Sequence, residues 1–145
     1  MKIAIGCDPN AESLKQSLIA TLTEEGYEVE DFGSDDIIYA NVAFKVGEAV
    51  ASGSHDRGIL ICGTGIGVSI AANKVKGVAA ALVSDCYSAQ RAALSNNANV
   101  ITLGSQVTGE KLAQELALTY LRQTYVPGGR SQPKVDRISE YEMDQ

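Results

Sequence analysis

The stretch that decides the fold runs from Gly58 to Lys74 and reads GILICGTGIGVSIAANK. It opens with a short apolar run, Ile59 to Ile61, which is typical of a strand buried on both faces of a parallel sheet. Cys62 ends this run, a glycine-rich loop follows, and Val68 to Lys74 is predicted to be a helix. The sequence therefore predicts a strand, a loop and a helix, with a thiol at the end of the strand.

The loop Gly63–Gly67 (GTGIG) has three glycines in five residues. Glycine lets the backbone come close to a ligand and aim N–H groups at it, beside the positive end of the following helix. Such a loop suits an anion or a developing oxyanion, and tight packing is the alternative explanation. It is not a P-loop, because no Gly-Lys-Ser/Thr follows, and a ribose-binding acid is missing about 20 residues further on, where a dinucleotide fold has one.

Length and composition describe an ordinary globular chain. With 145 residues, 45% of them hydrophobic and 21% charged, the sequence suits one domain, residues 1–145. A net charge of −6 argues against nucleic-acid binding, and no apolar run is long enough to span a membrane. Cys7, Cys62 and Cys86 are odd in number and lack CxxC spacing, so we expect a reduced, cytoplasmic protein. A single histidine disfavours a metal site.

Apolar patterns predict five strands that alternate with helices. The predicted strands are Lys2–Gly6, Tyr27–Phe32, Ile59–Ile61, Val78–Val83 and Val100–Leu103. A helical stripe such as Ala11, Leu14, Leu18 and Leu22 follows the first strand, and Leu112, Leu116, Tyr120 and Leu121 mark the last helix. This alternation predicts an α/β fold, a Rossmann-like three-layer α/β/α sandwich around a mostly parallel sheet. Residues 125–145 remain as a C-terminal tail.

The central stretch, ILICGTGIGVSIAANK, closely resembles the ribose-5-phosphate isomerase type B family, which includes both subunits of galactose-6-phosphate isomerase. The resemblance extends from KIAIGCD at the start to GGRSQPKVDRI near the end. It implies the strand order 2-1-3-5-4 and a sugar-phosphate aldose–ketose isomerase that works through an enediolate without a cofactor. It also implies a homodimer or homotetramer, or a hetero-oligomer with a sister subunit. The active sites would lie between subunits, and the tail 125–145 would complete the site or the dimer interface.

The family match assigns the chemistry to the central stretch. Cys62 would be the base that moves the proton between carbons, and a small core hydrophobe is the alternative reading of this thiol. Thr64 would stabilise the enediolate oxygen, together with backbone amides of the loop, and Ser69 would support the loop. The residues of this stretch expected to contact the substrate are Gly63, Gly65, Ile66, Gly67 and Ser69.

Asp8 stands at the end of the first strand, where ligands of open α/β sheets bind. In the family, an aspartate here is followed by a histidine, and the pair binds and opens the cyclic sugar. Here Pro9 replaces that histidine, and Asp8 also fits an N-cap with proline in the first helical position. Tyr39 matches a family tyrosine near the substrate, although its flanking residues differ, and a packing role is the alternative.

Two further departures fall on expected substrate contacts. The family's proton-donating histidine is Ser95 here, followed by Asn96 at the position of a sugar-binding asparagine. A serine hydroxyl is far too weak an acid to replace imidazole near neutral pH. Many relatives have a phosphate-binding arginine where this chain has Gln106. The only histidine, His55, lies in a polar turn, and we interpret it as solvated surface without a role.

The C-terminal segment supplies the expected phosphate clamp. Arg130 and Lys134 lie in GGRSQPK, which resembles the family's GGRHQ, with Ser131 in place of the histidine. Local positive charge in an acidic chain favours an anion site, and a solvated tail is the alternative.

Three functional readings remain open from the sequence. The first is an active isomerase whose substrate differs from ribose 5-phosphate, such as a short sugar phosphate with little closed-ring form. The second is a galactose-6-phosphate isomerase subunit that needs a partner chain. The third is a non-catalytic protein that binds sugar phosphates.

Overall fold

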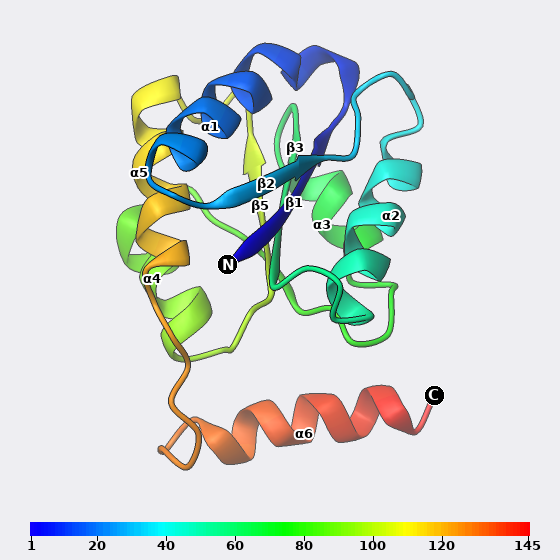
Figure 1. The fold of residues 1–145 in the computed structure, drawn as a ribbon. Helices are drawn as coiled ribbons and strands as arrows, with labels where there is room; N and C mark the ends of the chain where they lie inside the picture. The colour runs from blue at the N-terminus through cyan, green and yellow to red at the C-terminus, as the bar shows by residue number, and fades with distance from the viewer.

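The predicted strands form one parallel sheet. The computed structural model describes residues 1–145, with strands β1 (Lys2–Cys7), β2 (Glu28–Asp31), β3 (Arg57–Cys62), β4 (Ala80–Leu82) and β5 (Val100–Gly104). Their order is β2-β1-β3-β5-β4, and each neighbouring pair is parallel (Figure 1). The strand order that the family resemblance implied is confirmed, and β3 is the central strand.

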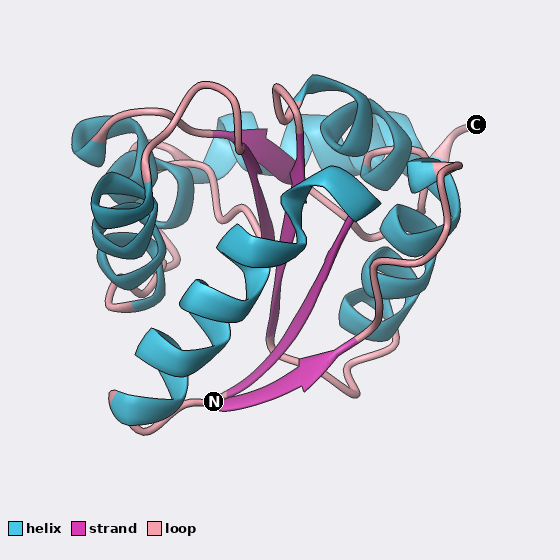
Figure 2. Cartoon of the chain, turned by 90° about the horizontal axis from the view of Figure 1, so that it is seen from above, coloured by secondary structure: helices cyan, strands magenta, loops and turns pink.

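Helices cover both faces of this sheet, so the three-layer sandwich is confirmed (Figure 2). One face packs against α1 (Glu12–Glu24), α4 (Cys86–Leu94) and α5 (Glu110–Leu121), and the other against α2 (Tyr39–Ala51) and α3 (Ile66–Ala72). Side chains of β3 alternate between these layers: Ile59 and Ile61 face the first, Leu60 and Cys62 the second. No helix has both the length and the apolar character needed to cross a membrane.

The chain ends in a helix that the sequence reading left as a tail. This helix, α6 (Gln132–Met143), has no buried residue. Figure 1 shows it lying across the end of the sheet where the strands begin. Near its C-terminus, Glu142 Oε2 accepts a hydrogen bond from the Gly77 N–H at 3.1 Å. Most of the α6 surface is therefore free to contact another molecule.

An ion cluster around the buried Lys15 connects α1 to the sheet beside the end of β1. Lys15 is 1% exposed, and its Nζ lies 2.8 Å from Asp31 Oδ1 and 2.9 Å from Glu12 Oε2. Burial alone lowers the pKa of Lys15, but the hydrogen bonds to these carboxylates outweigh it and the net pKa is raised. Asp31 also accepts from the Gly33 N–H at 2.8 Å, which places the loop after β2 next to the end of β1.

Candidate active site

Cys62 lies at the carboxyl end of the central strand and is 5% exposed. Its Sγ accepts a hydrogen bond from the backbone N–H of Gly65 at 3.2 Å. This donor gives a thiolate a fixed partner, and the thiolate is the reactive form of cysteine. The surroundings of Cys62 therefore suit a base or a nucleophile.

The loop after Cys62 is held in place by β5. Gly65 has φ +81°, a left-handed conformation that favours glycine, and its carbonyl accepts a hydrogen bond from Thr102 Oγ1 at 2.8 Å. Gly104 lies so close to Thr64 that a Cβ at position 104 would stand 2.6 Å from the Thr64 carbonyl. The backbone path of the loop thus depends on glycine at positions 65 and 104.

The helix that follows starts earlier than predicted. α3 begins at Ile66 rather than Val68, so Ile66 and Gly67 form its first turn. The phenol of Tyr39 packs on the backbone there, because a Cβ on Gly67 would lie 2.1 Å from Tyr39 Oη. Tyr39 therefore packs against the start of α3, in agreement with the packing alternative, and its contact with the substrate stays a prediction. The half-buried Ser69 makes no side-chain hydrogen bond that supports the loop.

Asp8 is beside Cys62 in the sheet. Cys7 pairs in register with Ile61, and the Asp8 N–H donates to the Ile61 carbonyl at 3.0 Å. Asp8 and Cys62 therefore lie side by side at the carboxyl ends of β1 and β3. Asp8 Oδ1 accepts from the Asn10 N–H at 2.8 Å and caps the short 3-10 helix η1 (Pro9–Ala11), while its second oxygen has no partner in the chain.

The neighbouring thiol of Cys7 is unsuitable as a base. It is fully buried and packs into the core layer on the other side of the sheet from Cys62. Burial raises the pKa of Cys7 to about 12, although the nearby Lys15 charge opposes this. Cys62 is therefore the thiol available for chemistry at this edge.

The remaining predicted site residues meet at the other end of the molecule. A cavity of about 260 Å³ lies between the end of α4 and the start of α6, and we name it the anion pocket. Its polar lining residues are Arg91, Ser95, Asn96, Arg130, Ser131 and Lys134. No carboxylate lines it, and none of its cations belongs to an ion pair. Sequence reasoning missed Arg91, although its spacing of four residues from Ser95 on a helix indicates a shared face.

Within one chain, the anion pocket lies far from Cys62. Val100, which follows Asn96 closely, pairs with Gly58 near the start of β3, whereas Cys62 ends that strand. From Arg57 to Cys62 the strand spans roughly 16 Å, at about 3.3 Å per residue. The thiol and the anion pocket thus lie at opposite ends of the strands, and Figure 1 shows α6 at the end where the strands begin.

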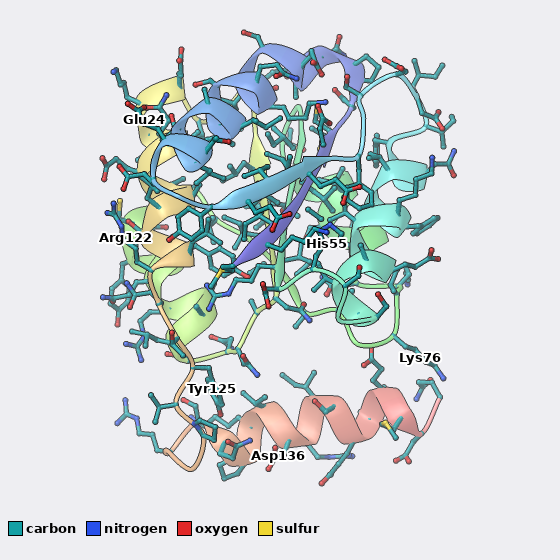
Figure 3. All side chains as sticks on the ribbon, viewed as in Figure 1. Glu24, His55, Lys76, Arg122, Tyr125 and Asp136 are labelled. Atoms are coloured by element: carbon teal, nitrogen blue, oxygen red, sulfur yellow. The ribbon has the colours of Figure 1, made fainter.

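The interpretation of His55 as solvated surface is wrong. His55 is 6% exposed, with Nε2 2.8 Å from Glu30 Oε1 and Nδ1 2.8 Å from Ser54 Oγ (Figure 3). The ring of Phe32 meets it edge-on at 5.2 Å between centroids. Glu30 and Phe32 come from the region of β2, so the local polar turn does not reveal this burial. His55 precedes β3 and is far from the Cys62 edge.

Comparison with known proteins identifies the family. The family model described as Ribose/Galactose Isomerase matches residues 3–138. The chain belongs to this family. It is a sugar-phosphate isomerase, an enzyme that interconverts aldoses and ketoses.

The individual relatives cover almost the full length. Ribose-5-P isomerase B of Listeria innocua is 49% identical, over 99% of this chain and 98% of that protein. D-erythrulose-4-phosphate isomerase of Pectobacterium atrosepticum is 47% identical, over 98% and 95%. The structure of Clostridium thermocellum ribose-5-phosphate isomerase B superposes with a TM-score of 0.93 at 44% identity, covering 99% of both chains. Relatives also include subunits of galactose-6-phosphate isomerase.

The contact between Gly104 and Thr64 predicts the effect of one added methyl group. In Gly104→Ala the new carbon would lie 2.6 Å from the Thr64 carbonyl, so the loop has to move. We expect kcat/KM to fall by about 10²-fold, the effect of displacing a catalytic group by roughly 1 Å. Gly109→Ala is the matched control, because nothing lies within 4 Å of its Cβ position. Steady-state kinetics and thermal unfolding of both variants make the test, and full activity in Gly104→Ala would contradict it.

Proposed function

We propose that this isomerase acts on an open-chain, four-carbon sugar phosphate, interconverting D-erythrulose 4-phosphate and its aldose. The observation that carries the proposal is the lack of imidazole at positions 9 and 95, where Pro9 and Ser95 stand. The sole histidine, His55, is buried against Glu30 and leaves both positions without a substitute. General acid–base assistance by imidazole is worth roughly 10² to 10⁴ in rate, so a substrate that needs ring opening would react slowly.

The chemistry of the substrate fits this loss. A four-carbon ketose phosphorylated at C4 has no hydroxyl placed to form a five- or six-membered ring with its carbonyl, and the same is true of its aldose. Such a substrate arrives in the open form and requires no acid for ring opening. The D-erythrulose-4-phosphate isomerase from Pectobacterium atrosepticum, reported above as 47% identical, supports this substrate class.

In the proposed mechanism, Cys62 takes the proton from one of the carbons C1 and C2 and returns it to the other. The intermediate is an enediolate, whose negative oxygen needs donors nearby. Thr64 and the Gly67 amide of α3 would supply them, while the Gly65 N–H donates to the Cys62 sulfur and the Ile66 N–H donates to Thr64 Oγ1. The free oxygen of Asp8 would hold a substrate hydroxyl. Tyr39, Ser69, Gly63 and Gly67 would shape the surrounding wall.

We further propose that each active site is shared by two chains. Asn96, Arg130 and Lys134 of one chain would hold the substrate phosphate and sugar against Cys62 of its partner, and residues 125–145 would complete this site. Three observations support the pairing: the two halves of the site lie at opposite edges, α6 has no buried residue, and apolar side chains are exposed on α3 and α6. A homodimer satisfies these needs, and a sister chain is the alternative partner.

The substrate proposal predicts a preference that kinetics can measure. We expect kcat/KM for D-erythrulose 4-phosphate to exceed that for ribose 5-phosphate by roughly 10² or more, because only the pentose needs ring opening. The variant with Pro9→His and Ser95→His should raise the rate on ribose 5-phosphate. Equal wild-type rates on the two substrates would contradict the proposal.

The role of Cys62 predicts a large loss of turnover. Cys62→Ala should lower kcat by several orders of magnitude while binding of the sugar phosphate survives, because the thiol acts mainly in the transition state. Cys7→Ala is the control. It removes a thiol from the same end of the sheet, but this thiol faces the other helix layer, so the variant should keep most of its turnover. A Cys62→Ala variant with nearly normal kcat would point instead to a carboxylate such as Asp8.

A shared site predicts that two inactive variants can complement each other. Cys62→Ala lacks the base, and Arg130→Ala with Lys134→Ala lacks the clamp, so each alone should be nearly inactive. In a mixed dimer, one of the two sites has an intact thiol and an intact clamp. Co-expression in equal amounts should restore about a quarter of the wild-type activity. Two differently tagged Cys62→Ala chains are the control, and a co-expressed pair that stays inactive would reject the shared site.

A further inference from the structure

Arg91 is the cation of the anion pocket with the most defined position. It lies in the last turn of α4, and its Nε donates a hydrogen bond to Ser95 Oγ at 2.7 Å. This is the only side-chain hydrogen bond of Arg91, so both terminal nitrogens of the guanidinium remain without a partner in the chain. A guanidinium held through Nε presents a fork that matches phosphate geometry and loses little freedom on binding.

The charges around Arg91 leave an anion as the natural ligand. Arg130 and Lys134 line the same cavity, and neither they nor Arg91 belongs to an ion pair. Glu142 lines only the larger adjoining cavity of about 650 Å³, where it accepts a hydrogen bond from Gly77. In a chain of net charge −6, a carboxylate-free group of three cations attracts a negative ligand from solution.

The hydrogen bond between Arg91 and Ser95 suggests a role for serine at position 95, where the family resemblance implies a histidine. Serine has a short side chain, and Arg91, one turn earlier on α4, donates its Nε hydrogen bond to the Ser95 hydroxyl. A cation thereby stands beside the position where the family resemblance implies an imidazole. Because Asn96 is the expected sugar contact, Arg91 extends the positive region toward the sugar end of the site.

We propose that Arg91, oriented by Ser95, binds the substrate phosphate as a third cation and selects for short substrates by drawing that phosphate toward Asn96. This inference rests on the proposed function and adds a specificity determinant to it. It also compensates for Gln106, which leaves the Cys62 edge without the arginine of many relatives. Ser95 is in this view a positioning residue and not an acid.

The test compares Arg91→Gln with Arg122→Gln, which removes the same charge from an exposed side chain outside both the pocket and residues 125–145. Calorimetry with inorganic phosphate should show about tenfold or greater weakening in Arg91→Gln only. The ratio of kcat/KM for D-erythrulose 4-phosphate to that for ribose 5-phosphate should also fall by about tenfold. Phosphate affinity and substrate ratio that match those of Arg122→Gln would overturn the proposal.

Further variants separate orientation from charge and from folding. Ser95→Ala keeps the Arg91 cation but removes the hydrogen bond that orients it, so we expect KM to rise about threefold with kcat unchanged. If Ser95 acted as an acid, the same variant would lower kcat. Arg91→Lys retains charge without the fork and should recover part of the phosphate affinity, and thermal unfolding checks the fold of each variant. Phosphate binding needs no turnover, so it tests the Arg91 contact independently of the substrate. If the wild-type chain is inactive on four-carbon substrates, the proposed substrate is rejected. Weaker phosphate binding by Arg91→Gln would still support the Arg91 contact in that case.

Discussion

The length of β3 separates the two halves of the candidate site, and the proposed sharing of each site by two chains depends on this separation. In a parallel sheet all carboxyl ends share one edge, so Cys62 and Asp8 meet there, while Asn96 and the start of α6 lie at the other. No side chain bridges roughly 16 Å of strand. The second chain proposed above would supply the missing half. It would also cover α6, a helix with no buried residue in an otherwise well-packed chain.

At the Cys62 edge, backbone geometry positions the groups proposed to face the substrate. Gly104 permits the approach of Thr64, Gly65 turns the chain in a left-handed conformation, and Gly67 leaves room for the phenol of Tyr39. The Gly65 amide can point at the Cys62 sulfur only because these contacts hold the loop on β5. The glycines thus serve packing, and the proposed chemistry at Cys62 depends on the same contacts.

The sequence predicted the parts of the structure that depend on local patterns. Strand five, the helical stripe of Leu14, Leu18 and Leu22, and the turn after Cys62 all follow from apolar spacing and glycine chemistry. Strand order came from the family resemblance, because periodicity does not say which strands pair. The two residues that the sequence analysis misjudged or missed depend on contacts distant in the sequence. His55 is covered by residues near β2, and Arg91 lines a cavity together with residues at the start of α6. Helix α6 has no buried stripe, so the usual helical pattern is weak there.

The departures from the family at positions 9 and 95 form a coherent set. Pro9 stands in the first turn of η1, where its fixed φ suits the helix and Asp8 caps the turn. Ser95 accepts a hydrogen bond from Arg91 and so gives a fixed direction to a cation. Both sites have exchanged a proton-transferring ring for a group that stabilises local structure. Such an exchange is tolerable only where ring opening is unnecessary, because neither a proline ring nor a hydroxyl bonded to a guanidinium can take and give a proton as an imidazole does. An open-chain substrate satisfies that condition, and its phosphate is the part that a permanently charged arginine can still recognise.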